Sequence, residues 1–268
     1  SSKKIPNTSG SITWANDNKT VFYNLKDLET LRTERVMKYD LSKDGSEKEI
    51  YYEDDETFSV YSYKTKSDKF IVIGSSATLS QEYRYIDASN PNGDFILFDQ
   101  RVDGLEYSIS HFKNKWYILT NKDNATNFKL MVCDEKSTNK ENWKEFISHS
   151  EETLLEGIDI FEDYLVITER NNGLRRINIK PWDKSESHYI KFDEEVYSLY
   201  SSTNPQMNTK KFRYSYSSMT TPNSVVEYDM VKRDTIILKE TEVLGGKFDK
   251  KNYHTMRVWA PTEDGKKV

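Results

Sequence analysis

Short segments in which hydrophobic and polar residues alternate recur along the chain, separated by turn residues. The clearest pair covers residues 213–222 and 224–229. In the first segment Tyr214 and Tyr216 alternate with polar residues, which is the spacing of a half-buried strand. A proline and an asparagine follow, and they mark a turn because proline fixes its own φ angle and asparagine tolerates turn geometry. This stretch therefore predicts a β-hairpin.

Similar hairpins recur about every 45 residues, and five units of four short strands can be laid over one another. In each unit the second strand is the most apolar. A period of 40–50 residues with four strands per unit is typical of a β-propeller blade. One blade cannot bury both of its faces alone, so neighbouring blades stack. The sequence predicts an all-β propeller with blades at about 11–52, 59–102, 106–149, 156–195 and 196–240.

The end of the chain departs from this period. After a glycine pair, residues 253–259 predict one further strand, and residues 262–265 are typical of a hairpin turn. The chain stops at Val268, where the partner strand of that hairpin would begin, so we expect the natural chain to continue. We divide the sequence into a partial propeller, 1–243, and a crossing segment, 244–268.

Composition agrees with an all-β fold. Aromatic residues make up 13% of the chain, and they bury large areas and favour strands. The net charge is −5 with both signs mixed, and no basic block indicates a nucleic-acid partner. The longest acidic runs, 53–56 and 193–195, fall between apolar segments, so we interpret them as solvated loops. No stretch approaches the ~18 consecutive apolar residues of a membrane span, so no membrane partner is expected.

The cysteine and histidine residues indicate no metal site. Cys133 is the single cysteine, and its apolar flanks predict a buried, inert thiol. His111, His149, His188 and His254 have no partner at the sequence spacing of a metal site or a catalytic triad. A metal site usually needs three or four convergent ligands, so we predict no metal and no cofactor. The histidines are expected to be structural or to lie on the surface.

Several segments resemble one propeller family in order and spacing. The most specific is the run Arg-Tyr-Ser-Tyr-Ser-Ser-Met-Thr-Thr-Pro at 213–222. Others are Trp14–Asp17, Ile50–Glu53, Leu155–Gly157, Tyr164–Val166 and Thr241–Val243. Together they resemble the propeller of the prolyl oligopeptidase family of serine peptidases, most closely its oligopeptidase B (protease II) branch. Tyr253, Arg257 and Gly265 fit the crossing of that family into its peptidase domain, whereas Met256 stands where an acidic residue is expected.

The resemblance implies a seven-bladed propeller that caps an α/β-hydrolase domain, with only the third to seventh blades and a return strand present here. No Gly-x-Ser-x-Gly motif occurs in the chain, so no catalytic residue can be carried over. The implied role is non-catalytic gating in a serine oligopeptidase that cleaves short peptides after basic residues, in the cytoplasm or the periplasm. The implied partners are the missing peptidase domain and short basic peptides.

The missing blades also predict how the fragment behaves. Packed side chains set the angle between blades, so we expect the five blades to remain an open arc. Blade faces without a neighbour would be apolar and would tend to associate.

Propeller geometry gives four candidate gating residues. The first strand of each blade lines the central channel of a propeller, and alternate side chains point into it. Glu106 and Glu156 stand at the starts of two such strands, and Asp159 and Glu162 lie further along the second. Carboxylates on this path would attract a cationic substrate. The alternative is that they are solvated loop charges or form interdomain salt bridges.

Three arginines are candidates for contact with the missing peptidase domain. Arg170 and Arg175 lie at predicted strand ends, and Arg257 lies in the crossing segment. Two other functions stay open at this point. One is a standalone propeller that binds proteins or peptides, and the other is a propeller glycosidase, which needs two carboxylates about 5–9.5 Å apart across a pocket.

Overall fold

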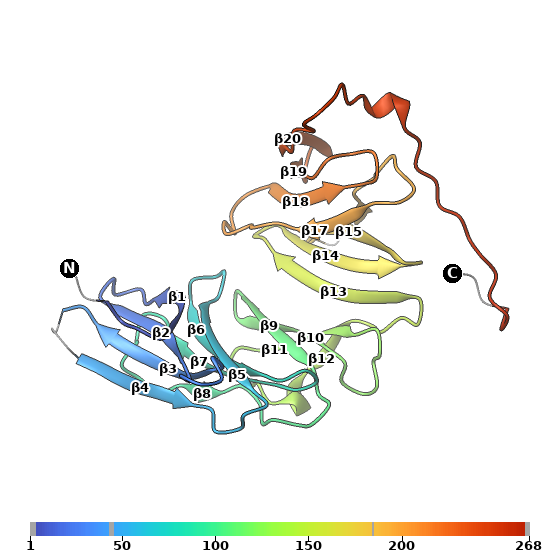
Figure 1. Cartoon of the computed structure of the whole chain (residues 1–268). Coiled ribbons are helices and arrows are strands. Elements are labelled where there is room, and N and C mark those ends of the chain that lie inside the picture. Colours follow the sequence, from blue (N-terminus) through green and yellow to red (C-terminus); the bar gives the residue numbers. More distant parts are fainter. Residues whose placement is uncertain (1–3, 43–45, 184, 266–268) are drawn as a thin grey trace. The chain divides into compact units, whose positions relative to one another are not determined.

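The computed structural model describes residues 4–42, 46–183 and 185–265, so Val268 lies outside the described part of the chain. Regular structure in the described residues is almost entirely β-strand, arranged as five antiparallel sheets of four strands each (Figure 1). The chain divides into two compact units, residues 1–150 and 151–268. The predicted all-β propeller architecture of four-stranded blades is therefore confirmed.

The first unit contains three of the sheets and one short 3-10 helix, η1 (Lys140–Asn142). The strands of its first sheet are β1 (Thr8–Trp14), β2 (Thr20–Lys26), β3 (Thr33–Asp40) and β4 (Ser46–Tyr52). Those of the second are β5 (Ser59–Lys64), β6 (Phe70–Ser76), β7 (Gln81–Asp87) and β8 (Ile96–Leu97). Those of the third are β9 (Tyr107–Phe112), β10 (Lys115–Thr120), β11 (Lys129–Asp134) and β12 (Lys144–Ile147).

The second unit contains the other two sheets, followed by a segment with one 3-10 turn, η2 (Lys250–Asn252). The strands of its first sheet are β13 (Thr153–Ile160), β14 (Tyr164–Asn171), β15 (Leu174–Pro181) and β16 (His188–Tyr189). Those of its second sheet are β17 (Ser198–Ser201), β18 (Lys211–Ser217), β19 (Ser224–Asp229) and β20 (Asp234–Glu240).

Every sheet keeps its strands in chain order, so the first strand forms one edge and the fourth strand the other. The second and third strands are flanked on both sides. In β6 all residues from Phe70 to Ser75 are buried, and in β10 all residues from Trp116 to Thr120 are buried. In the fifth sheet, however, the third strand, β19, is more buried than the second, β18.

The hydrophobic core lies between neighbouring sheets of each unit. In the first unit one cluster joins Phe22 of β2 to Ile71 of β6, and a larger one surrounds the fully buried Trp116. The Trp116 ring lies 5.0 Å from the ring of Phe70, across the boundary between two sheets. In the second unit a third cluster joins Val166 of β14 to residues of β18. Stacked blades therefore bury each other's faces, as four-stranded repeats require.

The hairpin predicted at 213–229 is confirmed, since β18 pairs with β19 and Tyr214 lies opposite Val226. The turn predicted at 262–265 is also present, with Gly265 at φ +80° and its amide 3.0 Å from the carbonyl oxygen of Thr262. The strand predicted at 253–259 is wrong. This segment pairs with no strand among the described residues, and without a partner its backbone groups cannot form a ladder.

Candidate functional site

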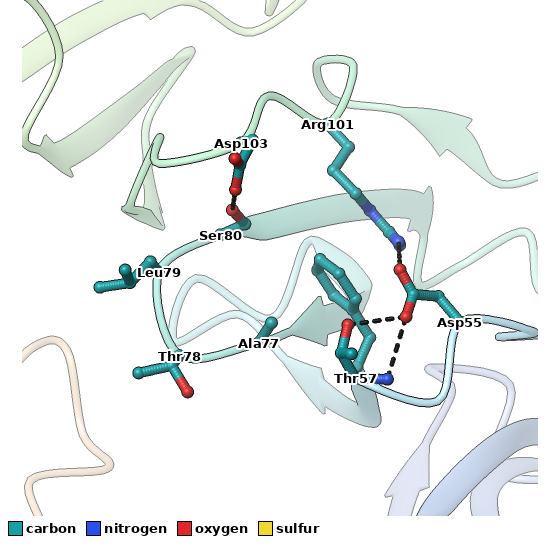
Figure 2. Close-up of a pocket in the computed structure, with 9 residues that line it drawn as sticks. Asp55, Thr57, Ala77, Thr78, Leu79, Ser80, Arg101 and Asp103 are labelled. Atoms are coloured by element: carbon teal, nitrogen blue, oxygen red, sulfur yellow. Dashed lines mark hydrogen bonds and ion pairs between the residues drawn. The ribbon is translucent and has the colours of Figure 1, made fainter.

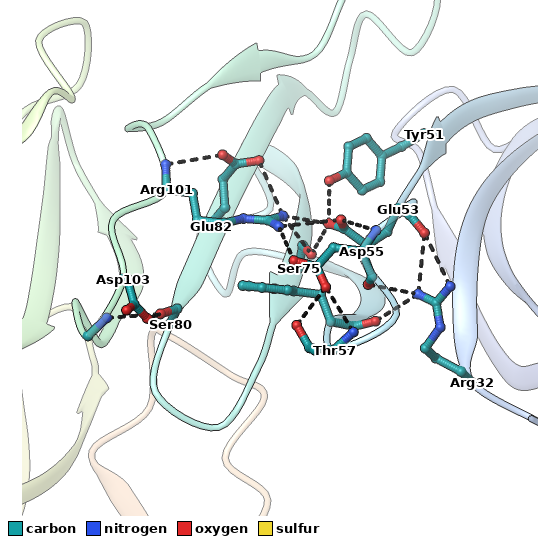
Figure 3. Close-up of polar contacts among 12 residues, drawn as sticks. Arg32, Tyr51, Glu53, Asp55, Thr57, Ser75, Ser80, Glu82, Arg101 and Asp103 are labelled. Carbon is teal, nitrogen blue, oxygen red and sulfur yellow. Dashed lines mark hydrogen bonds and ion pairs between the residues drawn. The ribbon is translucent and has the colours of Figure 1, made fainter.

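A buried carboxylate organises the connection between β4 and β5. Glu53 is 2% exposed and accepts hydrogen bonds from the hydroxyls of Ser75 at 2.5 Å and Tyr51 at 2.8 Å (Figure 3). Its second oxygen accepts from the backbone amide of Asp55 at 3.2 Å. Arg101 adds an ion pair, with Nη2 2.5 Å from Oε2 of Glu53. The acidic run 53–56 is therefore a loop as predicted, but its first residue is not solvated.

The hydrogen-bond donors keep Glu53 ionised. Burial alone would raise the pKa of this carboxyl, but the hydrogen bonds from Arg101, Ser75 and Tyr51 outweigh burial, and the pKa lies below its usual value. Conversely, burial and the neighbouring Glu53 carboxylate raise the pKa of Tyr51 to about 12. The hydroxyl of Tyr51 therefore stays protonated and continues to donate.

Arg101 connects the two ends of the second sheet. It lies in the connection that follows β8, and its guanidinium binds Glu53 in the connection that precedes β5. The same guanidinium lies 3.6 Å from the ring centroid of Phe58. The backbone amide of Arg101 donates to Glu82 of β7 at 3.2 Å. The second sheet is thus closed at this end by one cation held between carboxylates and an aromatic ring.

A second arginine fixes the backbone of the same loop. Nη1 of Arg32 donates to the carbonyl oxygens of Phe58 at 2.8 Å and of Glu53 and Asp55 at 3.3 Å each (Figure 3). Nη2 of Arg32 forms an ion pair with Glu34 at 3.1 Å. The loop therefore has both its side chains and its carbonyl groups held by charged donors.

A cavity of about 460 Å³ opens beside this network. It lies between the β4–β5, β6–β7 and β8–β9 connections, and Figure 2 shows Asp55 and Arg101 on one side of it and Ser80 and Asp103 on another. No sequence pattern predicts this cavity, because its lining comes from three loops that are separated in the chain.

The second unit brings together three residues that sequence analysis had predicted separately. Glu156 lies at a bulge in β13, where the register with β14 shifts between Leu155 and Gly157. A bulge turns a side chain away from its regular direction. Glu156 accepts from Nε of Arg170 at 2.8 Å and also from Nε of Arg175. Burial would raise the pKa of Glu156, but the two arginines hold it below its usual value.

The other predicted gating residues are not part of this triad. Asp159 is half-buried further along β13, and Glu162 is exposed in the turn after that strand. Glu106 belongs to the first unit, where it directly precedes β9 and accepts from the side-chain amide of Asn121 at 3.3 Å. The gating role of these four residues stays a prediction.

Arg257 holds the terminal segment against the turn between β14 and β15. Its Nη2 donates to the carbonyl oxygen of Asn172 at 2.6 Å, and its backbone amide donates to Glu195 at 3.1 Å. Arg170 of β14 binds the same turn, with Nη1 3.1 Å from the carbonyl oxygen of Gly173. The predicted contacts of Arg170, Arg175 and Arg257 with a peptidase domain stay predictions.

The carboxylate of Glu194 binds the terminal segment at Lys250, upstream of Arg257. Glu194 accepts from the hydroxyls of Thr220 at 2.5 Å, Tyr216 at 2.7 Å and Thr221 at 3.0 Å. Nζ of Lys250 lies 3.0 Å from the same carboxylate. Burial would raise the pKa of Glu194, but the side chains of Ser218, Thr220, Tyr216 and Lys250 lower it to about 2. The acidic run 193–195 therefore also contains a residue that binds within the fold, contrary to the prediction of a solvated loop.

His111 has partners that its sequence spacing does not reveal. Its Nδ1 lies 2.8 Å from the hydroxyl oxygen of Ser67, and its Nε2 lies 3.0 Å from Oε2 of Glu135. The imidazole is 3% exposed and packs against the rings of Phe70 and Trp116. Burial lowers the pKa of His111. This enclosed position agrees with the predicted structural role and gives a substrate no access to the ring.

The described residues contain neither a metal-binding cluster nor a membrane-spanning helix. No group of three or more His, Cys, Asp or Glu side chains is arranged to hold a metal ion in the described part of the chain. No helix within 4–42, 46–183 and 185–265 is long and apolar enough to cross a membrane. The thiol of Cys133 is buried, and burial raises its pKa to about 12.

Comparison with known proteins places this architecture in a family. Residues 2–241 match the family described as "Prolyl oligopeptidase, N-terminal beta-propeller domain". A dipeptidyl aminopeptidase BI of Pseudoxanthomonas mexicana is 37% identical over 98% of this chain and 36% of its own length. Protease 2 of Moraxella lacunata is 28% identical over 100% of this chain and 38% of its own length.

A solved structure shows the same fold. Oligopeptidase B from Leishmania major superimposes with a TM-score of 0.88 at 27% identity, over 99% of this chain and 39% of that chain. The chain therefore spans between 36% and 39% of the length of these relatives. The four-stranded sheets and the matched residues together show that the chain belongs to the prolyl oligopeptidase family, as part of its N-terminal β-propeller domain.

Proposed function

We propose that this chain is the non-catalytic, substrate-gating part of a serine oligopeptidase that cleaves short peptides after basic residues. The propeller admits short or unfolded peptides to an active site in a separate α/β-hydrolase domain, and it excludes folded proteins. The chain by itself has no peptidase activity, because it contains no Gly-x-Ser-x-Gly motif. That peptidase domain and short basic peptides are its partners.

The observation that carries this proposal is the share of each relative that the chain covers. Curated relatives with peptidase names are matched along nearly all of this chain but over less than two fifths of their own length. In each, the remainder is long enough to hold a catalytic domain, since domains typically have 50–250 residues and α/β domains can be larger.

Glu106, Glu156, Asp159 and Glu162 are proposed to face the path of the peptide. Support comes from their position, since β9 and β13 are first strands and therefore sheet edges. Glu156 acts there together with Arg170 and Arg175, so its charge is already compensated. Carboxylates on this path would attract a cationic peptide.

Two measurements test the proposal. The purified chain should not cleave an arginine or lysine ester, and cleavage that a serine-directed inhibitor blocks would overturn the claim of inactivity. The intact gene product should cleave a short arginine peptide but leave the same sequence uncut within a folded protein. A gene product without a downstream Gly-x-Ser-x-Gly segment would favour the alternative, a standalone propeller that binds proteins or peptides.

A further inference from the structure

We propose that the cavity between Asp55 and Asp103 binds the side chain of an arginine or lysine residue in a peptide. The cavity has a volume of about 460 Å³, within the range of about 300–1,000 Å³ that is usual for ligand pockets. Phe58, Ala77 and Leu79 supply apolar surface, and Leu79 is 59% exposed. This combination suits an aliphatic stem that carries a charge at its end.

The charges around the cavity favour a cation. The residues that line the cavity include two carboxylates, Asp55 and Asp103, and one guanidinium group, that of Arg101. Two negative charges and one positive charge leave a surplus of one negative charge at the cavity. The positive charge is also shared with Glu53, which lies outside the lining and binds Arg101 at 2.5 Å.

Arg101 lines the cavity but does not neutralise it. Its guanidinium is bound to Glu53 at 2.5 Å and lies over the ring of Phe58, whereas its distance to Asp55 is 3.8 Å. The Asp55 side chain is 45% exposed and remains accessible to a second cation. An incoming guanidinium or ammonium group would therefore find carboxylate oxygens that Arg101 only partly screens.

The Asp55 carboxylate is held in place before any ligand arrives, whereas that of Asp103 has only one long contact. The amide and hydroxyl of Thr57 donate to Oδ1 of Asp55 at 2.9 and 2.6 Å (Figure 2). The hydroxyl of Ser80 lies 3.5 Å from Oδ1 of Asp103 and accepts from the amide of Gly104 at 3.1 Å. A site whose groups are already ordered loses less entropy on binding.

This inference deepens the proposed function, because it names a contact for a basic peptide and rests on that function for the source of the peptide. The two can fail separately. Binding is measured on the chain alone without hydrolysis, so a negative result overturns the site and leaves the peptidase role intact. A lack of peptidase activity in the intact gene product overturns the role and leaves the binding result unchanged.

The probe is the blocked tripeptide acetyl-Ala-Arg-Ala-amide, titrated into the chain by NMR or calorimetry beside its glutamine analogue. We expect the arginine peptide to bind more tightly, by up to about 5-fold, because a partly exposed ion pair contributes up to about 1 kcal/mol. Raising the ionic strength from about 0.05 M to about 0.5 M should weaken its binding through screening. Equal affinities for the two peptides, or no binding, would overturn the proposal without any variant.

The double variant Asp55→Asn/Asp103→Asn locates the site. Asparagine keeps an oxygen that accepts from Thr57, so the loop should stay folded while both charges are removed. We expect affinity for the arginine peptide to fall to that of the glutamine analogue, by up to about 5-fold. The matched control Asp94→Asn/Glu186→Gln removes two exposed charges elsewhere and should leave affinity unchanged. An equal loss of affinity in the control would show that the peptide is attracted by the overall negative charge of the chain, and it would also refute the site.

Discussion

Glu53 in the first unit and Glu194 in the second occupy the same place in their sheets. Each lies in the connection that leads into a first strand, β5 for Glu53 and β17 for Glu194. Each accepts a hydrogen bond from a tyrosine hydroxyl, that of Tyr51 at 2.8 Å and that of Tyr216 at 2.7 Å. Each also accepts from a hydroxyl at the end of the second strand of its sheet or just beyond it.

The two sites differ in the cation that completes them. In both, the cation comes from the segment that follows the sheet, Arg101 after β8 and Lys250 after β20. The side chains of Glu53 and Arg101 are 3% and 26% exposed, whereas those of Glu194 and Lys250 are 11% and 55% exposed. The segment after β20 is thus held in the same way as the connection between the second and third sheets. Its ion pair, Lys250–Glu194, is more exposed than Arg101–Glu53, and water therefore weakens it more.

The largest effect should follow from Arg101→Ala. This change leaves the carboxylate of Glu53 buried without its counter-charge, which typically costs about 3–5 kcal/mol. Urea unfolding of the chain, followed by tryptophan fluorescence, measures the loss. The matched control Lys210→Ala removes a pair whose side chains are 60% and 56% exposed and should cost at most about 1 kcal/mol. Equal losses of unfolding free energy in the two variants would contradict the expectation that the buried pair contributes more than the exposed one.

An intermediate effect is expected for Arg175→Ala. Its target Glu156 is 17% exposed and keeps Arg170 as a partner, so the free energy of unfolding should fall by about 1.5–3 kcal/mol. Arg213→Ala serves as the control for the exposure of the arginine and should cost less. The Arg213 side chain is 50% exposed against 21% for Arg175, whereas their partners Glu227 and Glu156 are 16% and 17% exposed. If Arg175→Ala destabilises the chain as much as Arg101→Ala, the exposure of Glu53 and Glu156 does not determine the cost of removing their arginine partners.

Acid should remove the contribution of ionised Glu194 to the stability of the fold within a defined pH range. Its pKa is about 2 in the folded chain and 4.5 in its ordinary state, so its stabilising contribution is complete above about pH 4.5 and is lost as the pH falls towards 2. Subtracting the stability of Glu194→Gln from that of the parent chain at each pH isolates this contribution. We expect the difference to shrink steadily as the pH falls, and a difference that stays constant would contradict the lowered pKa.

The smallest change in stability should come from Lys250→Ala, at less than about 1 kcal/mol. Its local effect should be clear, because Lys250 ties the terminal segment to Glu194 and to the hydroxyl of Thr221. Hydrogen exchange of the amides around residues 247–253 should quicken, while exchange within β18 stays unchanged. Lys247→Ala is the control for loss of a charge in the same segment. Unchanged exchange in Lys250→Ala would mean that this pair does not hold the segment.

The strands and their grouping could be predicted because both depend on local pattern. The alternation around Tyr214 and Tyr216 gave the β18–β19 hairpin, and the period of about 45 residues gave the sheets. The segment 253–259 shows the limit of this approach. It has an alternating pattern, but a strand forms only when a partner supplies hydrogen bonds, and none is present in the described part of the chain.

The candidate sites were harder to predict, because burial is decided by distant segments. The acidic runs 53–56 and 193–195 have the composition of solvated loops, yet Glu53 and Glu194 are enclosed by donors from other strands. The partners of His111 stand 44 and 24 residues away in the sequence. The association of Glu156 with Arg170 and Arg175 follows from strand register, which the sequence alone did not specify.

The single thiol of the chain lies in the cluster that joins the second and third sheets, 4% exposed beside Trp116. A thiol that is buried and protonated cannot react with an alkylating reagent until the two sheets separate. The rate at which Cys133 is modified therefore reports on the opening of this blade boundary. In a fast-closing regime, that rate divided by the rate for an exposed thiol gives the equilibrium constant for opening. Cys133 is thus a built-in probe of the opening equilibrium between the second and third sheets.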